Sequence, residues 1–265
     1  MNLIIVGNGF DINHGLQTAY LDFKNFIKDK KNDLFTIDVL DTLYDLGEDW
    51  CDFEEGLGRI KETEKANQTI KILGNMGITA ITDILQKRFQ EWVHSICLVA
   101  PNKYRFNKND LFFSFNYTHT LENVYNVPIN NIKHIHGCVA DGLFGFGQKI
   151  KYGHSIGKSS SDPNRQALLT ETEKNVREII KQNESYFGNL KNVETIKIFG
   201  HSYSDIDFPY FERIDECVKG VKWEFGEFKP KDIQGAKFYM ERLGIDQSRG
   251  RILPSEELFE KTSTK

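Results

Sequence analysis

Short apolar runs alternate with stretches of helical periodicity along most of this chain. The runs are rich in β-branched and aromatic residues and end in glycine or polar residues, which is typical of strands buried in a parallel sheet. They predict strands at 3–6, 111–115, 131–136, 142–147, 195–199, 222–228 and 251–253. Between them, apolar residues at helical spacing predict helices at 20–31, 170–186 and 231–243. Strands that alternate with helices in this way favour an α/β fold with a mainly parallel sheet.

Residues 34 to about 100 have helical periodicity with no strand between the helices, and the glycines of Leu73–Gly77 interrupt it. We therefore expect a helical block inserted after the first strand and helix. Residues 1–260 are predicted to form a single α/β domain with this insertion at about 34–100, followed by a disordered tail at 261–265. Within the block, we expect a charged face or a lid over the site to be formed by Trp50, Asp52 and Glu54.

Composition and charge exclude several classes of protein. The formal net charge of −4 gives no reason to expect general nucleic-acid binding. The four cysteines contain no C-x-x-C pair, so we predict neither a disulfide framework nor a cysteine zinc site. No apolar run is long enough to span a bilayer, and we expect no signal peptide before the first core strand. These features predict a cytoplasmic protein that does not enter membranes.

Four polar segments directly follow predicted strands, at 7–15, 116–118, 134–137 and 200–205. Each has an ordinary interpretation: Asn116 as a turn residue, His136 as a hydrogen-bonded turn histidine, and Ser202 as a helix cap. Their joint occurrence favours a site, because ligands of open α/β sheets bind outside the carboxyl ends of the strands. We expect one site at the carboxyl ends of four parallel neighbours, residues 3–6, 111–115, 132–135 and 195–199.

The first polar segment has the features of a phosphate-binding turn. Gly7 and Gly9 would let the backbone approach a phosphate, and N–H groups at the start of the following helix would face the anion. The dinucleotide motif G-x-G-x-x-G is incomplete, because Ile12 occupies the place of its third glycine.

A series of longer motifs contains these segments. They are Gly7-x-Gly9-Phe10-Asp11-x-x-His14-Gly15-Leu16, Trp50-x-Asp52-x-Glu54, Phe115-Asn116-Tyr117-Thr118-x-Thr120-Leu121-Glu122, His134-x-His136-Gly137 and Gly200-His201-Ser202. In order and spacing this series resembles the bacteriophage abortive infection AbiH family over most of the chain. The resemblance implies a role in phage defence.

A more distant resemblance is to SIR2-like domains. Their phosphate-loop glycines are similar to Gly7, Gly9 and Gly15, their catalytic His-Gly pair to His136-Gly137, and their late G-x-S motif to Gly200 and Ser202. This resemblance implies a six-stranded Rossmann-like sheet that binds NAD, and in defence proteins of that type it implies NAD hydrolysis. The residues then expected to bind NAD are Gly7, Asn8, Gly9, Phe10, Asp11, Gly15, Gly200, Ser202 and Asp205. The expected catalytic residues are Asn116 and His136.

The leading hypothesis is a NAD glycohydrolase with NAD as substrate or ligand and no required cofactor. His136 would accept a proton from a ribose hydroxyl or from water, and Asn116 would position the water or the ribose. We interpret His134 as support for His136, and His119 as an exposed residue at a helix start.

Two alternatives stay open. One is a non-catalytic nucleotide sensor that switches a partner, which is favoured by Asp11 and Thr118 in place of the serine and aspartate of SIR2-like motifs. The other is a metal-dependent nuclease with ligands from His134, His136, Asp205 and Asp207, although the two aspartates have an ordinary role in capping the next helix. An unrestrained hydrolase would kill its host, so we expect a homo-oligomer or a regulatory partner.

Overall fold

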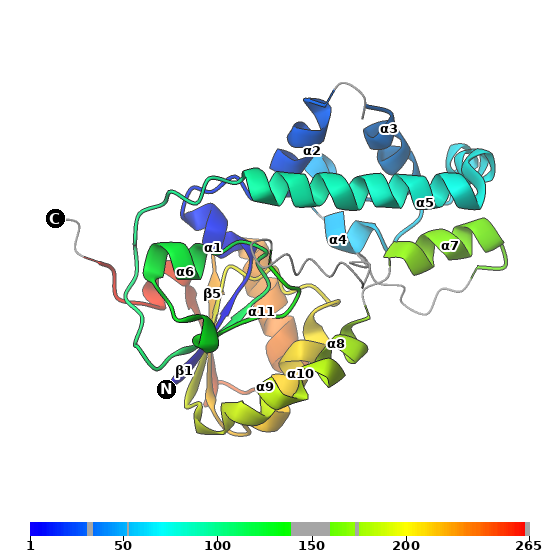
Figure 1. The fold of residues 1–265 in the computed structure, drawn as a ribbon. Helices are drawn as coiled ribbons and strands as arrows, with labels where there is room; N and C mark the ends of the chain where they lie inside the picture. Colours follow the sequence, from blue (N-terminus) through cyan, green and yellow to red (C-terminus); the bar gives the residue numbers. More distant parts are fainter. Residues whose placement is uncertain (31–33, 52, 139–159, 173–174, 263–265) are drawn as a thin grey trace. The chain divides into compact units, whose positions relative to one another are not determined.

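The computed structural model describes residues 1–30, 34–51, 53–138, 160–172 and 175–262 (Figure 1). The chain divides into two compact units, one formed by residues 1–17, 97–141 and 176–265, the other by residues 18–96 and 142–175. We call them the α/β unit and the helical unit. The helical unit begins earlier than the insertion expected at about 34–100, and it also takes in a later segment of the chain.

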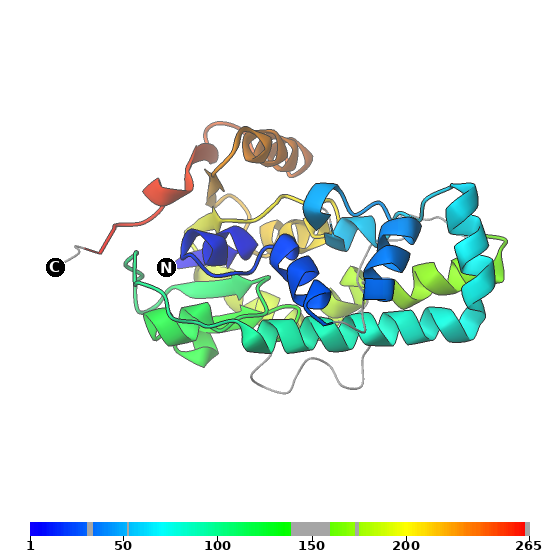
Figure 2. The ribbon, with the colours of Figure 1, turned by 90° about the horizontal axis from the view of Figure 1, so that it is seen from above.

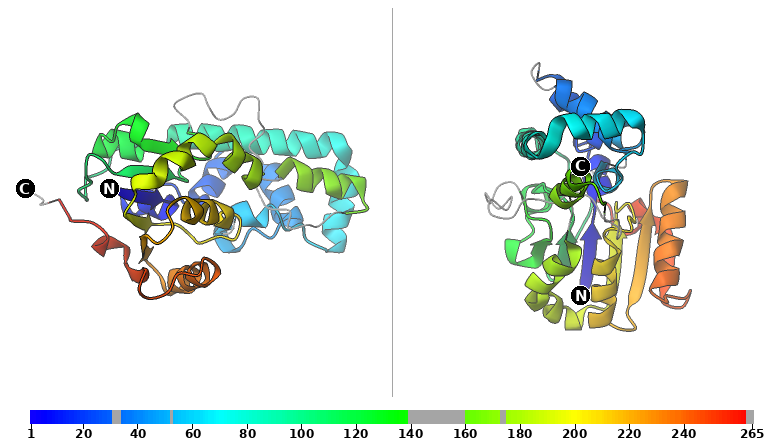
Figure 3. Two further views of the ribbon diagram at one scale, coloured as in Figure 1. Left: turned by 90° about the horizontal axis from the view of Figure 1, so that it is seen from below. Right: turned by 90° about the vertical axis from the view of Figure 1, so that its right-hand side faces the viewer.

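The α/β unit is built on one sheet of six parallel strands (Figure 3). The order is β3-β2-β1-β4-β5-β6. The strands are β1 (Asn2–Val6), β2 (Leu111–Ser114), β3 (Ile132–His134), β4 (Thr195–Phe199), β5 (Lys222–Glu227) and β6 (Gly250–Pro254). This confirms the predicted α/β, Rossmann-like fold, and the strand predicted at 142–147 lies outside the described residues. The order of strands reverses between β1 and β4, which is where dinucleotides bind in sheets of this order.

Apolar side chains of the central strands alternate between two cores, one on each face of the sheet. Leu3 and Ile5 of β1 belong to the larger core, with residues of α8 (Val176–Gln182), α9 (Glu184–Gly188), α10 (Phe208–Cys217) and α11 (Pro230–Arg242). Ile4 and Val6 belong to the other core, with residues of α1 (Asn8–Asn13) and α6 (Thr120–Tyr125). Figure 1 shows α6 on one side of the strands and α9, α10 and α11 on the other. Because both faces are covered, the central strands β1 and β2 are apolar at nearly every position.

Two predicted boundaries in this unit are corrected. The helix predicted at 170–186 is divided. Residues 170–172 end a separate helix of the helical unit, and Asn183, with φ −112° and ψ 18°, separates α8 from α9. Of the tail predicted to be disordered at 261–265, the first two residues pair: Lys261 bridges Tyr104, and the Thr262 N–H donates to the Lys103 carbonyl at 2.9 Å. Residues 263–265 lie outside the described residues. Short 3₁₀ turns complete the unit: η2 (Ile129–Asn131), η3 (Asn189–Asn192) and η4 (Ser255–Glu257).

The helical unit contains α2 (Tyr20–Lys28), α3 (Leu34–Leu43), η1 (Glu48–Trp50), α4 (Phe53–Gly56), α5 (Glu64–Ser95) and α7 (Pro163–Thr172). The predicted break near residue 74 is a bend in α5 (Figure 2), where Gly74 has φ 57° and ψ −176°. The core holds a cluster of aromatic rings, from Phe23, Trp50, Phe53, Phe89 and Trp92. Trp50 is fully buried there, so it is a core residue of this unit and not part of a charged face. Asp52, expected beside it on that face, lies outside the described residues.

Residues far apart in the sequence tie the helical unit together. The Arg165 guanidinium on α7 donates to the carbonyls of Ile60 and Lys61 at 3.1 and 2.8 Å. Tyr20 on α2 donates its hydroxyl proton to the carboxylate of Glu54. Among the described residues, no helix combines the length and the apolar character that crossing a membrane would require.

Candidate functional site

The strand order brings four polar segments to one edge of the sheet. β3, β2, β1 and β4 are successive parallel neighbours, so their carboxyl ends lie side by side. The segments that begin at Gly7, Asn116 and Gly200 follow three of these strands directly, and β3 itself ends at His134. The predicted adjacency of residues 3–6, 111–115, 132–135 and 195–199 is therefore confirmed.

The glycines after β1 pack against the backbone that follows β4. The Gly9 N–H donates to the Gly200 carbonyl at 2.8 Å, and the Gly7 N–H donates to the Phe199 carbonyl at 3.0 Å. A Cβ atom at Gly9 would lie 2.7 Å from the Gly200 Cα, and one at Gly200 would lie 2.2 Å from the Phe10 nitrogen. The glycines are thus required by the fold itself, and these two N–H groups are used inside it.

The other residues expected to bind NAD differ in their surroundings. Gly15 is exposed, with φ 80° and no atom within 4 Å of the place a Cβ would take, so its turn needs glycine for backbone conformation alone. Ser202 is exposed and makes no helix cap, and Asp205 forms an exposed ion pair with Arg242 at 2.7 Å. Asp207 is the N-terminal cap residue of α10, but its side chain makes no capping hydrogen bond, and its carboxylate faces the ring of His201 at 3.3 Å.

Asp11 is a buried carboxylate that links the ends of β1 and β2. Asp11 is 1% exposed, and its Oδ2 accepts a hydrogen bond from the Thr118 hydroxyl at 2.5 Å. Burial raises the pKa of Asp11 from 3.8 to about 6, against the opposing effect of the Thr118 and Thr120 hydroxyls and the Asn116 amide. The carboxylate therefore points toward the loop after β2 and not outward toward a phosphate.

Two acceptor atoms in this network are left without hydrogen bonds. Within the described part of the chain, Oδ1 of Asp11 and Oδ1 of Asn116 are buried and have no hydrogen-bond partner. The rest of Asn116 is held firmly, because its N–H donates to the Ser114 hydroxyl at 3.2 Å and its carbonyl accepts from His134 Nδ1 at 3.0 Å. Buried acceptors without donors are unfavourable in a folded protein, so this pair suits a ligand that carries hydroxyl or amino donors.

Glu122, at the start of α6, holds two histidines. Its Oε1 lies 2.9 Å from His119 Nδ1 and 2.9 Å from His134 Nε2. Burial alone would raise the pKa of Glu122, but these hydrogen bonds and the charge of His134 lower it to about 2. The His119 side chain is only 13% exposed, which corrects the expectation of an exposed residue. The physical reason is the carboxylate three residues later, which faces His119 across the first turn of α6.

His136 lies beyond the end of β3, among aromatic rings. Its ring centroid is 5.4 Å from that of Phe115, 6.2 Å from Tyr117 and 5.8 Å from Tyr210. His134 contacts the Asn116 carbonyl and Glu122. The hydrogen bonds of His134 thus support Asn116, and its support of His136 stays a prediction.

The sequence motif after β2 contained Thr120 and Glu122, but they were not predicted as site residues, and neither was Cys138. Glu122 follows His119 by three residues, a spacing that brings the two side chains together if a helix starts near residue 119. That helix start was the signal in the sequence that could have indicated their contact. Cys138 directly follows the His134-x-His136-Gly137 motif, but another neighbour in space, His119, comes from a different segment.

A cavity of about 350 Å³ lies at the opposite edge of the sheet, at the amino ends of β4, β5 and β6. Its arginines are already paired, Arg249 with Asp215 at 2.8 Å and Arg251 with Glu224. It is therefore a weaker candidate than the carboxyl edge.

Comparison with protein families agrees with the motifs found at this edge. The family model described as "Bacteriophage abortive infection AbiH" matches residues 3–78 and 67–226. This chain belongs to the AbiH family. The matched residues include β1 to β4 and the polar segments that follow them, so the candidate site of this AbiH protein lies inside the family region. Searches of curated proteins and of solved structures gave no match. The SIR2-like resemblance stays a prediction.

Proposed function

We propose that this AbiH protein is a cytoplasmic effector of abortive infection that hydrolyses the nicotinamide–ribose bond of NAD. The observation that supports the proposal most directly is the pair of buried acceptors, Oδ1 of Asp11 and Oδ1 of Asn116, at adjoining strand ends. A ribose carries neighbouring hydroxyl groups, each of which can donate to such an oxygen. Their position beside the reversal of strand order, between β1 and β4, is where a dinucleotide is expected to bind.

The residues suit the chemistry of this bond. Nicotinamide leaves as a neutral molecule from a cationic ring nitrogen and takes both electrons of the broken C–N bond, so no general acid is needed. The oxygen of a water molecule then bonds to the ribose carbon, and His136 or solvent accepts the released proton. Above about pH 6 the carboxylate of Asp11 is ionised and would stabilise positive charge that develops on the ribose.

The test is nicotinamide release by the purified protein, with and without an extract of phage-infected cells. Asn116→Ala and His136→Ala should each lower the rate by about 10²–10⁴-fold while the protein stays folded. His94→Ala is the matched control, because His94 is exposed in the last turn of α5. Full phage protection by His136→Ala at normal protein levels would overturn the hydrolase proposal.

A nucleotide sensor is the second candidate, favoured by the Asp11–Thr118 hydrogen bond that couples the β1 and β2 loops. A sensor would bind NAD with measurable affinity and release no nicotinamide under any condition. The metal-dependent nuclease has less support, because two of its four expected ligands are engaged elsewhere: Asp205 with Arg242, and Asp207 against His201.

A further inference from the structure

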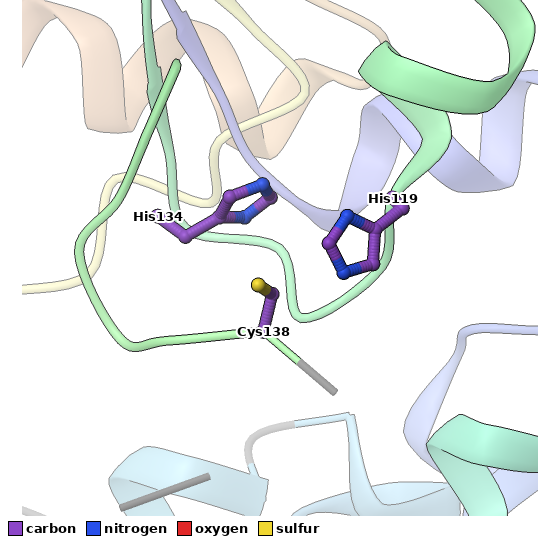
Figure 4. Close-up of side chains that lie close together, drawn as sticks. All are labelled: His119, His134 and Cys138. Carbon is purple, nitrogen blue, oxygen red and sulfur yellow. The ribbon is translucent and has the colours of Figure 1, made fainter. Parts of the chain in front are cut away.

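Two histidines and a cysteine converge beside the candidate site. His119 precedes α6, His134 ends β3, and Cys138 lies four residues further along the chain. One ring nitrogen of each histidine and the Cys138 sulfur lie within 4.8 Å of one another (Figure 4). Figure 4 shows the sulfur directed toward the space between the two rings. We propose that His119, His134 and Cys138 bind a zinc ion.

The surroundings of His134 provide an independent argument. Its Nδ1 lies 3.0 Å from the Asn116 carbonyl oxygen, and its Nε2 lies 2.9 Å from Glu122 Oε1. Both of these oxygens are acceptors. An imidazolium would donate to both of them, whereas a neutral imidazole, which has one N–H, leaves one lone pair facing an acceptor. A cation bound to that nitrogen removes the conflict. The remaining N–H then donates to a carbonyl or carboxylate, which is the usual arrangement around a metal-bound histidine.

The types of ligand select zinc over other ions. Imidazole and thiolate together suit Zn²⁺, whereas Mg²⁺ and Ca²⁺ prefer oxygen ligands. Zinc sites are tetrahedral, with bonds of about 2.0–2.3 Å to nitrogen and sulfur, which places ligand atoms about 3.3–3.8 Å apart. A spread of at most 4.8 Å closes to that geometry with small side-chain movements. Three protein ligands leave a fourth position for water or for a further group.

The local charges are also suitable. Zinc binding releases the thiol proton of Cys138, and the thiolate together with the Glu122 carboxylate would balance the two positive charges of the ion. Glu122 already contacts both histidines, so it orients the rings as a neighbour of the ligands. The ion would join the loop after β2 to the end of β3, and through His134 it would hold the Asn116 carbonyl in place. Sequence spacing predicted no metal site, because these ligands are brought together by the parallel pairing of β2 with β3.

The experiment measures metal binding directly and does not depend on enzymatic activity. A Cys51→Ser/Cys97→Ser/Cys217→Ser variant retains Cys138 as its single cysteine. Metal-free protein is titrated with Co²⁺, which reports a thiolate ligand through a near-ultraviolet charge-transfer band, and then with Zn²⁺, which should displace it. We expect about one ion per chain, with the band present in this variant and absent when Cys138→Ser is added. Glu122→Gln should weaken zinc binding about 10–100-fold.

Two results would overturn the proposal. One is the absence of a cobalt–thiolate band and of stoichiometric zinc in the single-cysteine variant while its circular dichroism is that of the parent. The other is zinc binding that is unchanged by His119→Ala and by Cys138→Ser, which would place the ion elsewhere. His94→Ala is the control for loss of a surface histidine and should leave the titration unchanged.

Discussion

Replacing Asp11 with asparagine should stabilise the protein at neutral pH and change how its stability depends on pH. The Asp11 carboxylate is buried, accepts a hydrogen bond from Thr118 through Oδ2, and has an Oδ1 atom with no partner in the described structure. Asparagine has nearly the same shape, keeps an oxygen for Thr118 and carries no charge. Its amide group would take the place of Oδ1.

The expected gain in the free energy of unfolding follows from the shift in the pKa of Asp11. A rise from 3.8 to about 6 corresponds to about 3 kcal/mol, at about 1.4 kcal/mol for each pH unit. Because the folded-state pKa is the higher one, the folded protein binds this proton more tightly than the unfolded chain does. The free-energy cost of burying the ionised Asp11 carboxylate is therefore absent below about pH 3.8. It grows as the pH rises and reaches its full size above about pH 6.

The assay is urea unfolding of parent and Asp11→Asn across this range. The variant-minus-parent difference in the free energy of unfolding should become more favourable to the variant by about 2–3 kcal/mol between about pH 4 and pH 8. A difference that does not vary with pH would refute the reasoning, whatever its absolute value. Thr118→Val, which removes the donor to Oδ2, should steepen the pH dependence of the parent, and Thr118→Ser should leave it almost unchanged.

Two further predictions concern the backbone and the proposed chemistry. Gly9→Val should lower the free energy of unfolding by more than about 4 kcal/mol, because its Cβ would meet the Gly200 backbone at 2.7 Å. Gly15→Ala should lower the free energy of unfolding by about 1–2 kcal/mol. Urea unfolding measures both, and a stable Gly9→Val protein would contradict the steric argument. In nicotinamide-release assays, the Asn116→Ala/His136→Ala double variant should be little slower than either single variant if the two residues act as a unit, and multiplicative losses would show that they act independently.

The strands were predictable from the sequence because both faces of the sheet are covered. Burial on two sides requires apolar residues at nearly every position, and a run such as Leu3–Val6 has no helical interpretation at that length. The interruption at Asn183 was not predictable in the same way, since the apolar spacing on either side of it fits one continuous helix.

The candidate site was predictable in its location and only partly in its contacts. Polar residues after apolar strands indicated which edge carries the site. Thr118, the hydrogen-bond partner of Asp11, is 107 residues away along the chain, and the sequence around either residue does not predict this hydrogen bond. Gly9 illustrates a different limit: the sequence shows that a side chain is excluded, but not whether a ligand or the Gly200 backbone excludes it.

The central position of β1 has a consequence for protein synthesis. β1 leaves the ribosome before both of its partners, which are residues 111–114 on one side and 195–199 on the other. At about 5–20 residues per second, about 200 residues take roughly 10–40 s to make. For that time an apolar strand waits with at least one edge unpaired, which favours capture by a chaperone. The turn after β1 gains its backing from Gly200 only once residue 200 has been made, so this part of the candidate site is completed long after β1 itself.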